Sequence, residues 1–353
     1  MRVSGQRPWS ADGRGLIGAA FGILLVAGMV EAAVLARLPQ AIFPEYGALC
    51  AGILAFRAAP WRARLADAAL FPFAAAVLGV GLDHVPVAFL VRWLAAIAGV
   101  LAMLWIARSV MVPSISAALL PLLFHYTGPV YPLAVLGSGL VLVLVAAADR
   151  RWVVKDRPVA LPARPGRVTL AALSLVVVPW SVVAIALGRP LIMVPPIIVA
   201  SLETIKAGRG DAWLRGAVLG ASALVGVAVH LVVPWAVLDA VVAVAASAAL
   251  QQLVRVPLPP AFALALLPLL FSTSAARTYG VLAAAGSMAV LLTAGLAVKV
   301  VASLAPGTGG RAATGAVAVA DGAGARVAKD AADNPGTVRL VPVHTPSVRG
   351  SRK

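Results

Sequence analysis

Charged residues, cysteine and histidine are scarce in this chain, and each shortage excludes a class of protein. The 353 residues are 61% hydrophobic and 12% charged, whereas soluble domains are typically about half apolar and about a quarter charged. The single cysteine, Cys50, excludes an intramolecular disulfide, and the four histidines show neither an HExxH motif nor a clustered spacing. We therefore expect no large soluble domain, no metal site and no cofactor.

Acidic residues are also few, with 13 Asp and Glu against 29 Lys and Arg, which gives a net charge of +16. A strongly basic chain can bind nucleic acid, but here the basic residues separate apolar runs and form no basic face or aromatic platform. We expect the lipid bilayer, and not nucleic acid, as the partner. The sequence contains no P-loop, GxSxG motif or triad spacing, so we expect no enzyme.

One stretch of the sequence occurs twice. Arg108–Phe124 reads RSVMVPSISAALLPLLF and Arg255–Phe271 reads RVPLPPAFALALLPLLF, and both end in ALLPLLF. The copies are too far apart for a solenoid, whose repeats are about 20–50 residues long. The sequence therefore predicts an all-α, polytopic transmembrane bundle of two tandem, pseudo-symmetric repeats, each with about six membrane segments.

Apolar segments give the predicted helices, because about 20 apolar residues span a bilayer. The first half contains 15–36, 44–56, 66–82, 87–107, 113–124 and 130–148, and the second contains 168–187, 195–205, 214–233, 235–254, 259–271 and 280–302. The second and fifth segments of each half are short and begin at or beside proline, which favours the first turn of a helix. The sequence leaves open whether these short segments span fully or re-enter.

The basic residues predict the topology. They concentrate in an N-terminus (1–14), a linker (149–167) and a tail (304–353) that flank two membrane repeats (15–148 and 168–303), while Arg37, Arg189 and Arg277 fall on the other side. Because Lys and Arg are enriched in cytoplasmic loops, we expect a plasma (inner) membrane protein with cytoplasmic termini. The composition of the tail predicts disorder.

We single out four charged residues within predicted spans, Glu31, Arg92, Glu203 and Asp239, because charge there is costly and often functional. Glu203, near the end of its segment, is expected to pair locally with Lys206 or Arg209. Arg92 and Asp239 occupy equivalent repeat positions with opposite charge, which predicts an ion pair between the halves. The alternative is that each side chain extends separately to the membrane surface. Glu31 lies past the middle of the first helix, and is either a proton-coupling group or an interfacial carboxylate.

The proline-started short helices predict a substrate site. A helix that begins inside the membrane has free backbone N–H groups at its start, and these suit an anion. The predicted substrate-binding residues are Arg108, Pro113, Ser114 and Ser116 in the first copy and Arg255, Pro259 and Pro260 in the second. The alternative is that the prolines only set helix boundaries.

Three stretches of the second half carry a family resemblance. Leu191–Ser201, Gly216–Val229 (GAVLGASALVGVAV) and Leu258–Leu267 (LPPAFALALL) resemble the HPP family of integral membrane proteins, although Leu258 replaces the motif histidine. This resemblance implies movement of nitrite or another small anion. The duplicated halves also resemble, more weakly, the fusaric acid resistance and aromatic acid exporter type.

Together these features predict a membrane transporter or permease for a small, anionic solute. The alternative is a non-transporting membrane scaffold or assembly partner, in which the halves only pack. The sequence leaves open whether the chain forms a homo-oligomer.

Overall fold

The computed structural model describes residues 13–152, 173–206 and 211–304, and these residues form helices joined by short loops, with no strand among them. The predicted all-α class is confirmed. The predicted N-terminal segment lies almost completely outside the described residues, as do most of the linker and nearly all of the tail. Apart from the last two residues of the final helix, the helices belong to one compact unit, Met1–Ala302.

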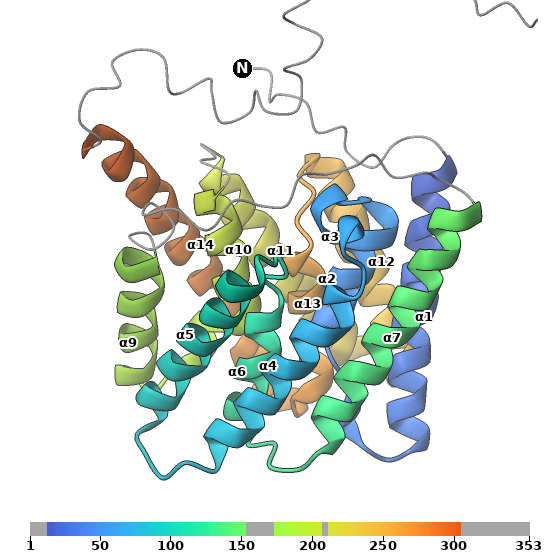
Figure 1. Ribbon diagram of the computed structural model, residues 1–353, viewed down its shortest axis with the longest axis horizontal. Helices are drawn as coiled ribbons and strands as arrows, with labels where there is room; N and C mark the ends of the chain where they lie inside the picture. The colour runs from blue at the N-terminus through green and yellow to red at the C-terminus, as the bar shows by residue number, and fades with distance from the viewer. Residues whose placement is uncertain (1–12, 153–172, 207–210, 305–353) are drawn as a thin grey trace, which may run out of the picture. The chain divides into compact units, whose positions relative to one another are not determined.

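The first half contains seven α-helices and two short irregular helices (Figure 1). They are α1 (Gly13–Leu35), η1 (Pro39–Ala41), α2 (Glu45–Cys50) continued by η2 (Ala51–Ala55), α3 (Ala59–Ala63), α4 (Asp67–Asp83), α5 (Phe89–Ala107), α6 (Ser114–Phe124) and α7 (Val130–Trp152). All six predicted segments correspond to helices, and the sequence missed the three-residue η1 and the five-residue α3.

The second half follows the same order of long and short helices. It contains η3 (Leu173–Val177) continued by α9 (Val178–Ala186), η4 (Pro190–Met193), α10 (Pro195–Lys206), α11 (Ala212–Val232), α12 (Ala236–Val254), α13 (Pro260–Leu266) continued by η5 (Leu267–Leu270), and α14 (Thr273–Leu304). The last helix begins at Thr273, earlier than the predicted 280, because polar residues in its first turns do not prevent helix formation.

Six helices are long and apolar enough to cross a membrane: α1, α5, α7, α11, α12 and α14. Their outward faces carry large apolar side chains, including Leu24, Leu144 and Leu253, which are at least 65% exposed. Soluble proteins rarely expose so much apolar surface. These faces are therefore suited to lipid.

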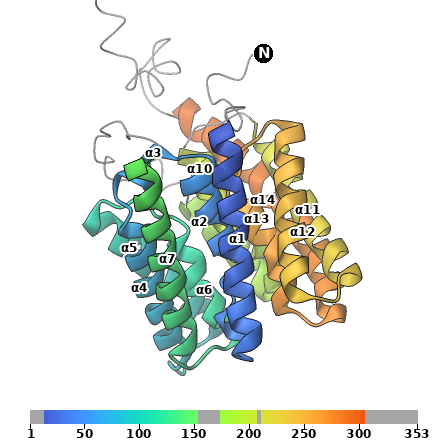
Figure 2. The same ribbon diagram turned by 90° about the vertical axis from the view of Figure 1, so that its right-hand side faces the viewer.

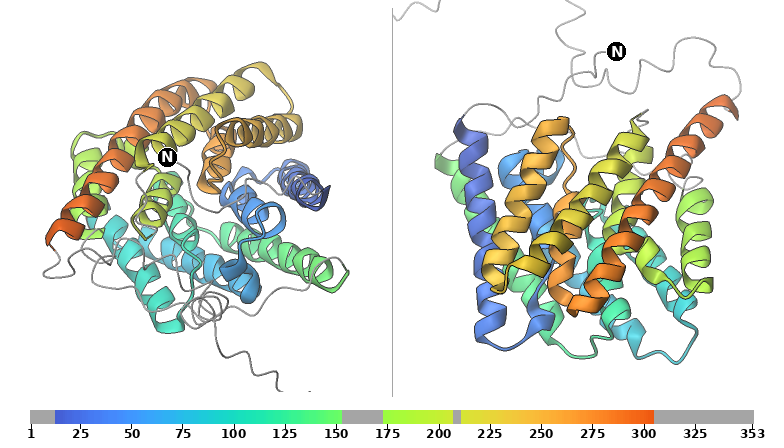
Figure 3. Two further views of the ribbon diagram at one scale, coloured as in Figure 1. Left: turned by 90° about the horizontal axis from the view of Figure 1, so that it is seen from above. Right: turned by 180° about the vertical axis from the view of Figure 1, so that it is seen from behind.

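Four shorter helical segments, α2–η2, α6, α10 and α13–η5, lie inside the bundle and are almost completely buried. At about 1.5 Å per residue, each is too short for a hydrocarbon core of about 30 Å. Two of them also pack across the halves: α2 packs on α13 as well as on α1, and α10 packs on α6 as well as on α13. Similarly, α1 packs on α12 (Figure 2), and α9 packs on α5 (Figures 1 and 3).

Two glycines allow the short helices to approach their neighbours closely. A Cβ atom added at Gly79 of α4 would overlap the backbone carbonyl of Ala118 in α6. A Cβ atom at Gly226 of α11 would overlap the carbonyl of Ala265 in α13 in the same way. Only glycine fits at either contact.

Candidate functional site

The structure separates the residues that were predicted to bind substrate. Arg108 and Arg255 are exposed at the ends of α5 and α12, where both adopt the left-handed conformation with φ of 51° and 60°. Pro113, Ser114, Ser116 and Pro260 are buried, and Pro259 is half-buried. The two guanidinium groups therefore lie at the surface, apart from the buried residues, and substrate binding by these seven residues stays a prediction.

The starts of the short helices also differ from the prediction. In α6, the Ser114 N–H donates to the Met111 carbonyl (3.1 Å) and the Ser116 N–H donates to the Pro113 carbonyl (3.1 Å). In α13, the Ala261 and Phe262 N–H groups donate in the same way to residues 258 and 259. These tight turns satisfy the first donors of each helix. The predicted free N–H groups for an anion are therefore absent at these positions.

Arg92 and Asp239 do not pair with each other. Arg92 donates to the Asp83 carboxylate at 2.8 Å, and Asp239 binds His230 Nδ1 at 2.7 Å. Each bond joins two consecutive long helices of one half across a short loop. The predicted pair between the halves is wrong because each charge finds a nearer partner in its own half. His125 also lies 3.4 Å from Asp83.

Glu31 lies on the exposed face of α1, while Val30 and Ala33 of the same helix point into the core. This exposure fits the interfacial alternative. The proton-coupling role of Glu31 stays a prediction.

The interior carboxyl group belongs instead to Glu45, which sequence reasoning overlooked. Glu45 is the first residue of α2 and is 1% exposed. Neither of its carboxyl oxygens has a hydrogen-bond partner among the described residues. The available signal was a lone acidic residue directly after Pro44, at the start of a short apolar segment; it resembled an ordinary first-turn acid, which is favourable near a helix start.

Three hydroxyl groups surround Glu45, and we call these four residues the Glu45 cluster. The Ser116 hydroxyl of α6 lies beside the carboxyl but not in hydrogen-bonding geometry. Tyr131 of α7 and Tyr279 of α14 are both fully buried and lie near Glu45. The Ser116 and Tyr131 hydroxyls, like the carboxyl, have no partner among the described residues.

The Tyr279 side chain is held by a backbone carbonyl that Pro268 leaves without a donor. Pro268 has no N–H, so it leaves the carbonyl of Leu264, four residues earlier, without its usual helical donor. The Tyr279 hydroxyl donates to that carbonyl at 2.7 Å. The proline in the repeated ALLPLLF stretch thus fixes one wall of the Glu45 cluster.

Six aromatic rings form a continuous belt across the two halves. The rings, in order of contact, are Phe43, Tyr131, Tyr126, Phe124, Phe271 and Tyr279, with centroids 5.1–6.2 Å apart. Phe124 and Phe271, which close the two copies of the repeated stretch, meet at 5.1 Å. Because Tyr131 and Tyr279 belong to both groups, the belt holds the Glu45 cluster where the halves meet.

The extended segment before α13 is anchored by a buried polar chain. The Gln251 side chain accepts the Leu258 N–H at 2.8 Å and lies 3.4 Å from the Ser247 hydroxyl, which in turn donates to Ser222 at 3.1 Å. These contacts fix the chain just before Pro259, and so set where α13 begins.

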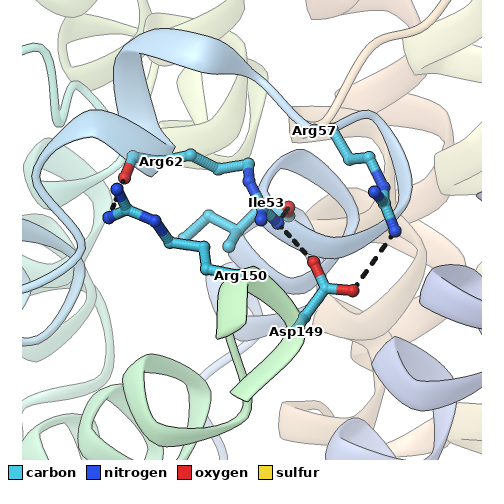
Figure 4. A network of polar contacts seen from close by, with 5 residues as sticks. All are labelled: Ile53, Arg57, Arg62, Asp149 and Arg150. Carbon is cyan, nitrogen blue, oxygen red and sulfur yellow. Dashed lines mark hydrogen bonds and ion pairs between the residues drawn. The ribbon is translucent and has the colours of Figure 1, made fainter. Parts of the chain in front are cut away.

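A second polar network lies at the end of the bundle near α3 (Figure 4). Asp149 accepts from Arg62 at 2.8 Å and from Arg57 at 3.2 Å. Arg62 is 1% exposed and also donates to the Ile53 carbonyl at 3.1 Å, near the end of η2. Arg150 donates to the Arg62 carbonyl at 3.2 Å. A cation at a helix C-terminus is favourable, so this network fixes the short α2–η2 segment to α7.

The described residues contain no group of three or more His, Cys, Asp or Glu that could hold a metal ion. A hollow between α1, α2, α12 and α13 is lined by apolar residues such as Gly22, Cys50, Val244 and Phe262. Among the described residues, the Glu45 cluster gathers three buried groups without a hydrogen-bond partner, on Glu45, Ser116 and Tyr131. No family model matches the chain, and no curated protein or solved structure matches it either.

Proposed function

We propose that the chain is a plasma membrane transporter for a small solute, with its termini in the cytoplasm. The six long apolar helices and their exposed apolar faces support the membrane assignment. The start of α1 and the ends of α7 and α14 lie at one end of the bundle (Figure 1). Arg62, Arg64 and Arg150 lie at that end too, as expected for a cytoplasmic face.

We further infer that the bundle consists of two duplicated halves in one membrane orientation. Three equivalences support this inference. Gly79 contacts Ala118 as Gly226 contacts Ala265. Arg108 and Arg255 end equivalent helices with positive φ. The short helix α2 packs on α13 of the other half, as α10 packs on α6 of the other half. The resemblance to the HPP family stays a prediction.

The observation that carries the transport proposal is the unsatisfied, buried Glu45 cluster between the short helices. A buried polar group without a partner costs about 1–3 kcal/mol, and a protein that only packs its halves together has no need of several. Intramembrane ionisable groups usually mark solute or ion pathways. An anionic solute, as the sequence predicts, fits this cluster only while Glu45 is protonated, because an ionised carboxylate would repel it.

The alternative of a scaffold without transport activity is favoured by the packing between the halves. The aromatic belt closes their junction, and the nearby hollow is apolar. A transporter must therefore change conformation to open a polar path, whereas a scaffold need not.

Uptake by the purified full-length chain in liposomes tests the proposal. The probes are nitrite, nitrate, chloride, acetate and lactate, together with sodium as a cationic comparison. Ser116→Ala should lower uptake of the transported probe about tenfold, because one lost hydrogen bond corresponds to about 1.4 kcal/mol. Ser274→Ala, at an exposed hydroxyl, is the control. Uptake no greater than in empty liposomes for every probe would favour the scaffold.

A further inference from the structure

Hydroxyl groups lie near Glu45, and no cation among the described residues is bonded to it. Its carboxyl oxygens make no hydrogen bond or ion pair with any described residue, Arg, Lys and His included. Helices α1, α7 and α13 and the continuation η2 pack around α2. Of these, α7 contributes Tyr131, while α13 and η2 are apolar.

The remaining titratable groups near Glu45 do not balance its charge either. On α1, the inward-facing side chains Val26, Met29, Val30 and Ala33 are apolar, and Glu31 is exposed. Tyr279 of α14 and Ser116 of α6 reach the site from farther along the chain. On α2 itself, Tyr46 and Cys50 are buried. The buried hydroxyl and thiol groups among these are neutral near pH 7 in their ordinary protonated form.

An ionised carboxylate in such a place is unfavourable. Removing a charge from water without a partner costs several kcal/mol, and such a group usually takes up a proton instead. The carboxyl is therefore neutral in the packed arrangement. Ionisation becomes favourable when water enters, or when the Ser116 and Tyr131 hydroxyls turn to donate to the carboxylate.

We propose that Glu45 is the site at which this protein binds and releases a proton during transport. In the release step, the carboxyl O–H bond breaks, the proton passes to water, and the carboxylate keeps the electron pair. Rebinding restores the neutral acid and closes the site. This inference rests on the proposed transport function, and it implies that transport of the solute is coupled to transport of a proton.

The proton itself is the probe for the test. Infrared difference spectra of the full-length protein in liposomes, taken while the pH is stepped between acidic and alkaline, report the C=O stretch of a neutral carboxyl group. The wild type should show one such band that moves in heavy water and disappears as the pH rises. Glu45→Gln should lose it, whereas Glu31→Gln, at an exposed carboxyl of the neighbouring helix, should keep it.

A second variant keeps the proposal testable if Glu45→Gln does not fold. Tyr131→Phe removes one hydroxyl that can donate to the carboxylate, so the band should persist to higher pH. A band that survives in Glu45→Gln, or a wild-type band that does not respond to pH, would overturn the proposal. Loss of the band on adding sodium at constant pH would also overturn it, since the site would then bind a metal cation.

Transport measurements distinguish this inference from the proposed function. If Glu45 carries the proton, a pH gradient should drive accumulation of the transported probe in the wild type but not in Glu45→Gln. If uptake is equal in both proteins and does not depend on the pH gradient, the proton-site inference is wrong while the transport proposal stands. If Glu45 titrates but no probe is taken up, the transport proposal is wrong instead.

Discussion

Asp83 and Asp239 are acidic residues near the same end of the bundle, and each is paired with a basic side chain nine positions away in the sequence. Asp83 binds Arg92, and Asp239 binds His230. In the first pair the acid lies on the earlier helix, and in the second pair it lies on the later one. The two halves thus keep a polar contact at one place while exchanging which helix supplies the charge.

A double-mutant cycle separates this arrangement from a pair between the halves. Arg92→Ala and Asp83→Ala should show a coupling energy of about 1 kcal/mol, because the two side chains, 16% and 2% exposed, bond directly. Thermal unfolding in detergent measures it. The cycle of Arg92→Ala with Asp239→Ala serves as the control and should be additive. If only the control cycle shows coupling, Arg92 interacts with Asp239 and not with Asp83, which would contradict the observed pairs.

The Glu45 cluster shows why residue-scale function was hard to predict. Sequence reasoning included Ser116 but grouped it with exposed arginines, because helix starts and basic residues are visible in sequence. Tyr131 and Tyr279 lie on the last helices of different halves, and only tertiary packing brings them to Glu45. Because these residues are far apart in the sequence, the sequence alone could not show that they form one site.

At the scale of elements, most helices were predictable because apolar length and proline leave clear marks. Pro113 and Pro260 stand at the starts of α6 and α13, as predicted. The contacts that short helices make across the halves were not predictable, since apolar segments of similar composition fit several partners equally well. Shape makes the choice, at contacts such as Gly47 of α2 against Leu266 of α13 between the halves and Gly79 against Ala118 within the first half.

Gly79→Ala should therefore destabilise the protein, although alanine is normally the better helix former. The added methyl group would meet a backbone carbonyl, which cannot move aside as a side chain can. We expect a loss of about 1–3 kcal/mol, as for other overpacked cores. Gly81→Ala, in the same helix with open space around it, should be neutral or stabilising by up to about 1 kcal/mol. Equal melting temperatures for the two variants would contradict this close approach.

At the scale of the whole molecule, the proposed topology can be tested with one native cysteine. Cys50 is 1% exposed, so it should give little background labelling. Arg277→Cys, at an exposed outer position, should react with a membrane-impermeant maleimide in intact cells. Arg255→Cys, exposed at the other end, should react only after the cells are permeabilised. The reverse pattern would invert the proposed orientation.

The packing of α2 of the first half on α13 of the second half has a consequence for biosynthesis. While the ribosome is still making residues 260–270, α2 has no α13 on which to pack, and Glu45 lacks the wall that Tyr279 later provides. The first half must therefore wait in the bilayer with its central surface uncovered. A nascent chain that stalls before α13 would present that surface to insertases and quality-control proteases. The core can therefore be completed only after α13 and α14 have been synthesised.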